Sequence, residues 1–155
     1  MRNRQKGFSL IELLIVVAII LIIAAIAIPN LLRSKMAANE ASAVGSLRSI
    51  NTAAVAWSTQ CGSYPPSLAA LGPPFVACTT GDLIDSVLAL GTKSGYTFVY
   101  TTPGTSGGVA GTTYDVTATP VTIGSTGQRG FFTDQSGVIR ANTSGTATQT
   151  DLPIG

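Results

Sequence analysis

Few residues of this 155-residue chain could carry out catalysis or hold a metal ion. The chain has no histidine, which removes the usual general base, the commonest metal ligand and the central member of a Ser-His-Asp or Cys-His site. Its two cysteines, Cys61 and Cys78, are too few for a closed zinc site without histidine, although carboxylates could complete one. We therefore expect no catalytic residue, no metal site and no cofactor, and we predict that the chain is not an enzyme.

The two cysteines have a second possible role. In an oxidising compartment Cys61 and Cys78 are expected to form a disulfide, and free buried thiols are the alternative. The bond would close a loop of a size worth roughly 3 kcal/mol in the chain-entropy estimate. Whether it forms depends on whether this part of the chain is exported.

An acidic residue, Glu12, lies at the edge of a long apolar run. Leu13 to Ile28 is a stretch of sixteen apolar residues without a break. A helix over residues 8–28 would be on the order of 30 Å long, about the thickness of the hydrocarbon layer of a bilayer. The sequence therefore predicts a membrane-spanning helix, in which a carboxylate is costly and needs a partner. The span offers no cation, and the alternative is that Glu12 extends to the lipid headgroups.

The distribution of charge predicts the orientation of this helix. Three cations, Arg2, Arg4 and Lys6, precede the first acidic residue and favour a cytoplasmic N-terminus, which places the chain after Ile28 outside the cytoplasm. From residue 7 onward 6 Lys and Arg face 7 Asp and Glu, so that part of the chain has no basic excess. No specific nucleic-acid binding is expected.

The sequence KGFSLIE at residues 6–12, the apolar helix after it and Pro29 resemble the leader and N-terminal helix of type IV pilins and pseudopilins. The resemblance covers about the first sixty residues. It implies that a prepilin peptidase cuts between Gly7 and Phe8 and methylates the new amine of Phe8. The amine of one subunit would then meet the Glu12 carboxylate of a neighbour, and Pro29 belongs to the same assembly helix.

This resemblance implies a structural protein, the precursor of a subunit of a type IV pilus-like filament. Such a subunit is held in the cytoplasmic membrane as a single-pass protein until an assembly platform and motor move it, with identical or related subunits, into a fibre on the cell surface. The nearest alternative is a pseudopilin of a type II secretion system, which shares every N-terminal feature.

Three further alternatives come from other classes. The small-residue site Ala25-Ile26-Ala27 fits ordinary signal peptidase, which would release a soluble protein beginning at Ile28. The chain could instead be a membrane-anchored binding domain that never polymerises. An exported enzyme is the third alternative, but the sequence has no constellation of residues that supports it.

Beyond the apolar run, residues 29–57 read as an amphipathic stalk helix with a kink at Pro29. One face carries apolar residues at spacings of 4, 7, 4, 3, 4 and 3, namely Leu32, Met36, Ala43, Leu47, Ile50, Ala54 and Trp57. The other face is expected to carry Arg33, Lys35, Asn39, Glu40 and Arg48. Trp57 is expected to mark the end of this helix.

The remaining residues, 58–155, are expected to form a globular head. A connecting region, 58–94, would hold short helices at 67–71 and 82–90, the second capped by Thr80 and closed by Gly91. In residues 95–155 a period of two predicts strands around 96–101, 114–119, 129–134 and 138–141, with a loop at 104–111 and a turn at 134–137. Asn142-Thr143-Ser144 matches a glycosylation pattern of low specificity.

The predicted organisation is thus a leader (1–7), a membrane and assembly helix (8–28), a stalk helix (29–57) and a head (58–155). The fold class is α+β, with a long N-terminal helix whose second half packs on a small antiparallel sheet of three to four strands. Pilins have this architecture as well.

Overall fold

The structure of the chain, a computed structural model, describes residues 8–102 and 111–154. It divides into two compact units, Met1–Ser34 and Lys35–Gly155. The leader 1–7, which includes Gly7 of the expected cleavage site, lies outside the described residues. So does the expected loop 104–111 except for its last residue.

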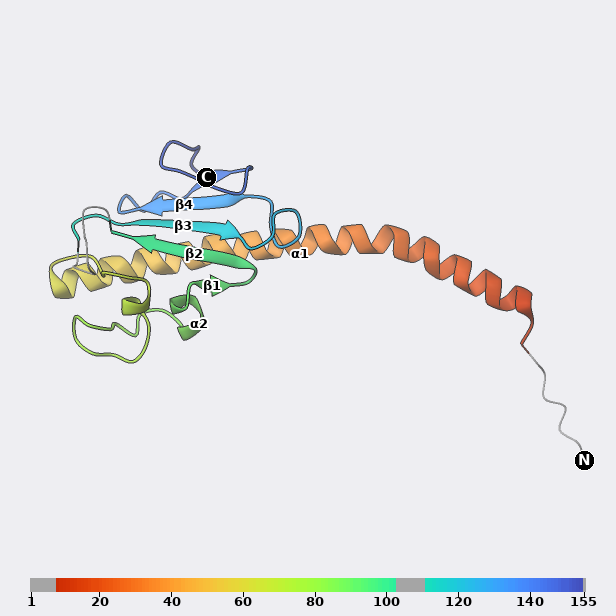
Figure 1. Ribbon diagram of the computed structural model, residues 1–155, viewed down its shortest axis with the longest axis horizontal. Helices are drawn as coiled ribbons and strands as arrows, with labels where there is room; N and C mark the ends of the chain where they lie inside the picture. The colour runs from red at the N-terminus through yellow and green to blue at the C-terminus, as the bar shows by residue number, and fades with distance from the viewer. Residues whose placement is uncertain (1–7, 103–110, 155) are drawn as a thin grey trace, which may run out of the picture. The chain divides into compact units, whose positions relative to one another are not determined.

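One long helix, α1 (Leu10–Cys61), contributes to both units (Figure 1). The helix continues through Pro29, although a proline nitrogen cannot donate the usual backbone hydrogen bond. The expected end at Trp57 is wrong, because α1 ends at Cys61. The next residue, Gly62, has a φ of 74°, a left-handed conformation that glycine commonly supplies just after a helix.

The second unit contains a five-stranded antiparallel sheet in which each strand pairs with the next one along the chain. The strands are β1 (Thr92–Lys93), β2 (Tyr96–Thr101), β3 (Asp115–Pro120), β4 (Gly130–Asp134) and β5 (Arg140–Asn142). The predicted α+β fold is confirmed, and the sheet has more strands than the three to four expected. The additional strand, β1, has only two residues and is too short to show a period in the sequence.

A tight turn makes the first hairpin possible. Lys93 pairs with Tyr96, so two residues, Ser94 and Gly95, connect β1 to β2. Both have positive φ values, 50° and 74°, as a two-residue turn that matches the twist of its strands requires.

The last strand lies slightly later in the chain than expected. The predicted turn is present, since the Gly137 N–H donates to the Asp134 carbonyl at 2.9 Å. An Asp134 carboxylate oxygen also accepts from the Ser136 N–H at 2.8 Å. Val138 and Ile139 then lie outside the strand, and β5 begins at Arg140, so the expected strand 138–141 is shifted by two residues at its start.

The core lies between the second half of α1 and one face of the sheet (Figure 1). The expected apolar stripe is buried from Ala43 onward, where its members are at most 3% exposed, whereas Leu32 in the first unit is exposed. The alternating faces of the strands are also as expected. The residues that fill this core include Ala43, Leu47, Ile50, Ala54 and Trp57 from α1 and Tyr96, Phe98, Val116, Ala118 and Phe131 from the strands.

A polar link crosses this core. Asn51 accepts a hydrogen bond from the Tyr114 hydroxyl at 3.0 Å and donates one to the Thr133 hydroxyl at 2.9 Å. Asn51 lies on α1, Tyr114 directly precedes β3 and Thr133 lies in β4. Because buried polar groups orient their partners, this link helps to fix the register of α1 against the sheet.

The two short helices of the connecting region are smaller than predicted. The first is a 3₁₀ turn, η1 (Ala69–Leu71), and the second is α2 (Ser86–Ala89), in place of a helix over 82–90. Asp82 has a φ of 49°, which a right-handed helix excludes, so the cap is Asp85 and the expected cap at Thr80 is wrong. Gly91 closes the end as expected, with its N–H on the Leu88 carbonyl at 2.9 Å.

Candidate assembly site

The site that the sequence singles out begins at the N-terminus of α1. Phe8, the residue expected to become the first of the mature chain, is 80% exposed. Ser9 accepts the first helical hydrogen bond, from the Leu13 N–H to its carbonyl at 3.2 Å. Ser9 is therefore the N-cap of the helix and Glu12 stands at its third position.

The Glu12 side chain turns back toward this helix start. Its Oε2 atom accepts a hydrogen bond from the Ser9 backbone N–H at 3.0 Å. An acidic side chain at the third position that bonds the N-cap N–H forms half of a capping box, and its charge suits the positive end of the helix dipole. This local partner of Glu12 is a backbone N–H group and not the cation that was expected. The spacing Ser-x-x-Glu would have revealed it.

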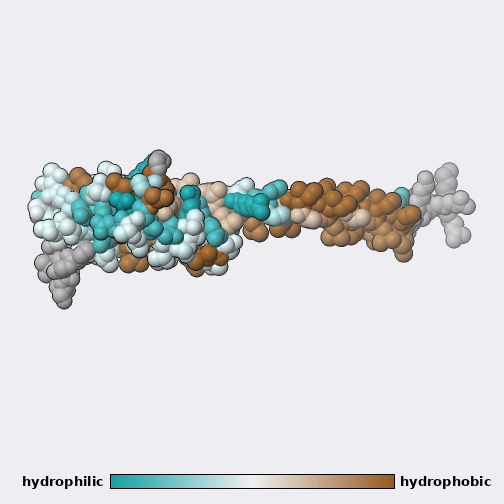
Figure 2. All heavy atoms as spheres, turned by 90° about the horizontal axis from the view of Figure 1, so that it is seen from above, coloured by the Kyte–Doolittle hydropathy of each residue, from teal (hydrophilic) through white to brown (hydrophobic). Residues whose placement is uncertain are grey.

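The apolar helix that follows is uncovered. Every large apolar side chain from Phe8 to Ile28 has an exposed surface fraction of 43% or more. Figure 2 shows these side chains as an apolar surface over the helical part of the first unit. The helix is long and apolar enough to cross a membrane, and none of its most apolar window is buried inside the structure. A buried core helix is therefore not what this segment forms.

A second acidic residue, Glu40, lies on the buried face of α1. It was assigned to the solvent face of the stalk helix, but it is only 8% exposed. Its Oε1 atom accepts hydrogen bonds from the backbone N–H groups of Gln128 at 2.9 Å and Arg129 at 3.1 Å. Its Oε2 atom accepts from the Arg129 Nε at 2.8 Å.

These contacts have a net electrostatic effect on Glu40. Burial raises the pKa of the carboxyl, but the hydrogen bonds from Gln128 and Arg129 and the positive charge of Arg129 outweigh burial and hold the pKa below its ordinary value. Asn39 is also misassigned, since it is half-buried and its side-chain amide donates to the Thr126 carbonyl at 2.8 Å. The spacing of Glu40 to Ala43 and Leu47, three and seven residues, was the signal that places it on the buried face.

We call the contacts of Asn39 and Glu40 with residues 126–129 the loop clamp. They attach the segment between β3 and β4 to α1. Because a charged pair with three hydrogen bonds is directional, the clamp fixes where this loop lies on the helix.

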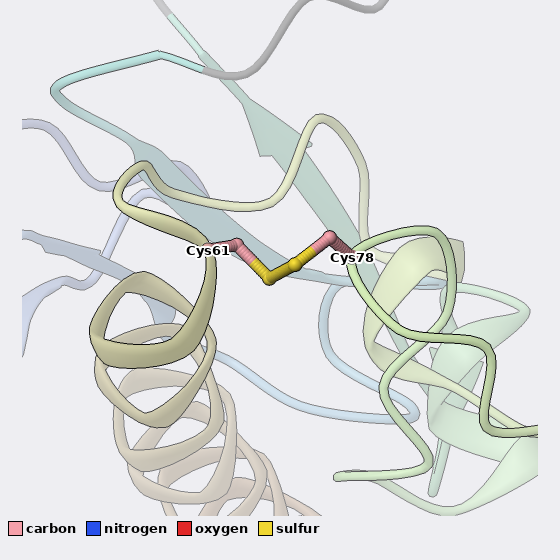
Figure 3. Close-up of a disulfide and its surroundings, with 2 residues drawn as sticks. All are labelled: Cys61 and Cys78. Atoms are coloured by element: carbon pink, nitrogen blue, oxygen red, sulfur yellow. A yellow bond between two sulfur atoms is a disulfide. The ribbon is translucent and has the colours of Figure 1, made fainter.

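The end of α1 is attached by a covalent link. The structure contains the expected disulfide between Cys61, the last residue of α1, and Cys78 of the connecting region (Figure 3). The bond joins residues separated by 17 positions. It ties the loop after α1 back to the helix, in a part of the chain that has little regular secondary structure.

Other candidate residues have structural roles. Within residues 8–102 and 111–154 no group of three or more His, Cys, Asp or Glu side chains lies close enough to hold a metal ion. Asn142 of the glycosylation pattern donates from its amide to the Asp151 carboxylate at 2.7 Å, and its carbonyl accepts from the Ser144 N–H at 2.8 Å. The amide nitrogen is thus engaged within the fold.

Parts of the chain are similar to known proteins. Residues 2–28 match the prokaryotic N-terminal methylation motif. The chain is 65% identical over 40 residues to the type IV wide pilus major component PilA4 of Thermus thermophilus, covering 26% of this chain and 30% of that protein. It is 50% identical over 50 residues to the type IV major pilin PilA of Myxococcus xanthus, covering 32% and 23% of the two chains.

A longer match reaches into the head. The chain is 36% identical over 97 residues to the type IV major fimbrial protein FimA of Dichelobacter nodosus, which covers 61% of this chain and 56% of that protein. The chain thus spans less than two thirds of the length of each of these relatives. The chain thus carries the N-terminal methylation motif and is similar over part of its length to these type IV pilins, and its fold is α+β.

Proposed function

We propose that this chain is the precursor of a structural subunit of a type IV pilus-like filament. The prepilin peptidase would cut between Gly7 and Phe8 and methylate the amine of Phe8. The mature subunit would wait in the cytoplasmic membrane, with its N-terminus in the cytoplasm and its head outside. An assembly platform and motor would then move it into a surface filament of identical or related subunits.

The observation that carries this proposal is the uncovered apolar helix with Glu12 at its start. A helix whose large side chains are all exposed is stable only in lipid or in contact with other apolar helices. Transfer from lipid to a bundle changes apolar burial little, so close packing and polar pairs must provide the selectivity. The proposal therefore needs an external motor and a specific pair.

Phe8 and Glu12 are the proposed pair. Cleavage would create an amine at Phe8, and the Glu12 carboxylate of a neighbouring subunit is its counter-ion. The bond to the Ser9 N–H uses Oε2, and a carboxylate can accept several hydrogen bonds, so Oε1 can face that amine. Because one member left unpaired in an apolar bundle costs several kcal/mol, pairing would set the stagger between subunits.

Mass spectrometry of the mature N-terminus tests the processing step. We expect a chain that begins at a methylated Phe8, and a full-length chain in cells that lack the prepilin peptidase. A chain that begins at Ile28 would instead identify a soluble product of ordinary signal peptidase. Electron microscopy with an antibody against the head then separates long surface fibres from the short periplasmic assembly expected of a pseudopilin.

A further inference from the structure

One loop of the head exposes apolar side chains to water. All seven residues from 73 to 79 are exposed, and the first five are proline or apolar, namely Pro73, Pro74, Phe75, Val76 and Ala77. Phe75 and Val76 are 61% and 51% exposed. Apolar residues scattered singly over a surface need no explanation, whereas contiguous ones indicate contact with something outside the chain. We call residues 73–79 the apolar loop.

Hydrogen bonds and a disulfide hold the apolar loop in one shape. Val76 and Thr80 donate their N–H groups to each other's carbonyls, both at 2.8 Å, and the Thr80 hydroxyl bonds the Pro74 carbonyl. The disulfide ties Cys78 to the last residue of α1, as Figure 3 shows. A loop that is already ordered loses little conformational entropy on binding, so its exposed side chains are held ready for a contact.

The chemistry of the apolar loop suits an apolar medium. No charged residue occurs from residue 49 to residue 81, so the loop can leave water without burying a charge of its own segment. Two of its residues are prolines, which have no N–H, and the N–H groups of Val76 and Thr79 are bonded inside the loop. Most positions of the loop therefore offer no free N–H group that lipid would leave unsatisfied.

We propose that the apolar loop inserts into the surface of a lipid bilayer that has no net charge. This inference rests on the proposed function, because a single loop with two large apolar side chains binds a bilayer weakly, whereas a filament repeats the loop in every subunit. A binding pocket of another protein would offer hydrogen bonds as well as apolar contact, and this loop has few groups to use them.

Co-flotation of purified filaments with phosphatidylcholine vesicles tests the inference. Phe75→Ser removes the largest apolar side chain of the loop. Leu90→Ser is the matched control, because Leu90 is even more exposed, at 84%, and lies outside the loop. Formation of the disulfide and the filament yield show that each variant has folded and assembled. We expect Phe75→Ser to lower the apparent vesicle affinity roughly tenfold or more, and Leu90→Ser to bind like the wild type.

The buried Trp57 makes a fluorescence measurement possible. Trp57 is the only tryptophan in the sequence and is 3% exposed, so it gives a background that vesicles should not change. Phe75→Trp places a second tryptophan in the apolar loop and keeps an aromatic side chain there. We expect the emission of this variant to shift to the blue when neutral vesicles are added and to be quenched by brominated lipid. Leu90→Trp should show neither change.

Several outcomes would overturn the inference while leaving the proposed function intact. One is a Phe75→Ser filament that binds neutral vesicles as the wild type does, and another is a Phe75→Trp filament whose emission does not respond to them. Binding that requires anionic lipid, or that is lost at high salt, would show that charge and not the apolar loop makes the contact. A wild-type chain that forms no filament would overturn both, because the contact depends on repetition of the loop.

Discussion

The Oε2 atom of Glu12 lies 3.0 Å from the backbone nitrogen of Ser9, within the first turn of α1. Glu12 therefore has a structural role in its own chain before any second subunit is present. Two functions of the same carboxylate can be separated, because capping needs an oxygen acceptor whereas pairing with an amine needs a negative charge.

The two variants Glu12→Gln and Glu12→Ala separate the capping role from the charge-pairing role. Glutamine keeps an acceptor for the Ser9 N–H and loses the charge, and alanine loses both. If the charge sets assembly, both variants should be processed at Phe8 yet lose filament yield by about 100-fold or more, since an unpaired buried charge costs about 3–5 kcal/mol. Filament yield is measured as the amount of this protein in the material sheared from the cell surface. Native yield and stagger with Glu12→Gln, but not with Glu12→Ala, would show that the cap alone matters.

The Glu40 carboxylate of the loop clamp should stabilise the folded head. Removal of Glu40 by Glu40→Ala should lower the free energy of unfolding by about 2 kcal/mol, since hydrogen bonds to charged groups contribute about 1.5–3 kcal/mol. The estimate stays toward the lower end because the Arg129 side chain is 45% exposed. Thermal unfolding of the full chain in detergent measures the difference.

The free energy of unfolding should also depend on pH, and the lowered pKa of Glu40 sets the direction of that dependence. The folded state holds this pKa below the ordinary value of 4.5, so the stabilisation is present above that value and is lost as the pH falls through the folded pKa. Asp115 has a raised pKa because of burial and the nearby Asp134, and it contributes with the opposite sign. The Glu40 contribution is isolated by comparison with Glu40→Gln, whose stability difference from the wild type should shrink in acid. A difference that stays constant with pH would contradict this assignment.

The sequence was sufficient for the elements whose burial is regular. In β2 and β3 every second residue faces the core, and from Ala43 to Trp57 the buried residues of α1 recur at helical spacing. In these segments the residues that recur as apolar in the sequence are the residues that the fold buries. The α+β class could therefore be predicted. The N-terminal motif could likewise be recognised from the sequence, because all of its residues lie in one short contiguous segment.

The errors arise where tertiary contacts override local signals. The spacing of Glu40 to Ala43 and Leu47 favours the buried face, but its charge favours solvent, and the partner that makes burial of that charge possible, Arg129, lies 89 residues later. The helix expected from Asp82 is shortened because the Asp82 N–H bonds the Gly72 carbonyl at 3.0 Å and the Leu83 N–H bonds the Leu71 carbonyl at 2.8 Å. No local pattern in the sequence reveals such partners.

The disulfide should stabilise the connecting region more than the sheet. In the chain-entropy estimate a loop of this size contributes about 3 kcal/mol. The double variant Cys61→Ser with Cys78→Ser should therefore lower the melting temperature and increase hydrogen exchange chiefly in residues 62–84. The wild type under reducing conditions should behave like the variant, and the variant should not respond to reductant. An unchanged melting temperature would show that the bond contributes nothing to the stability of the head.

The cap of α2 allows a test of two contributions from one side chain. Asp85 Oδ1 accepts from the Leu88 N–H at 2.9 Å, and Oδ2 lies 2.7 Å from the Lys93 Nζ. Both contacts lower the pKa of Asp85. Asp85→Ala removes the cap and the ion pair, and loss of an N-cap costs about 1 kcal/mol. Asp85→Asn keeps a capping oxygen and removes the charge, and an exposed ion pair contributes at most about 1 kcal/mol and typically much less.

We therefore expect chemical denaturation to rank Asp85→Ala as less stable than Asp85→Asn, with Asp85→Asn close to the wild type. Asp82→Asn is the matched control, because Asp82 lies outside α2 and asparagine tolerates its positive φ. This control should have native stability. Equal losses for Asp85→Asn and Asp85→Ala would mean that the pair with Lys93, rather than the cap, holds α2 in place. In that event raising the salt concentration should weaken the wild type toward the variants, because exposed charges are screened.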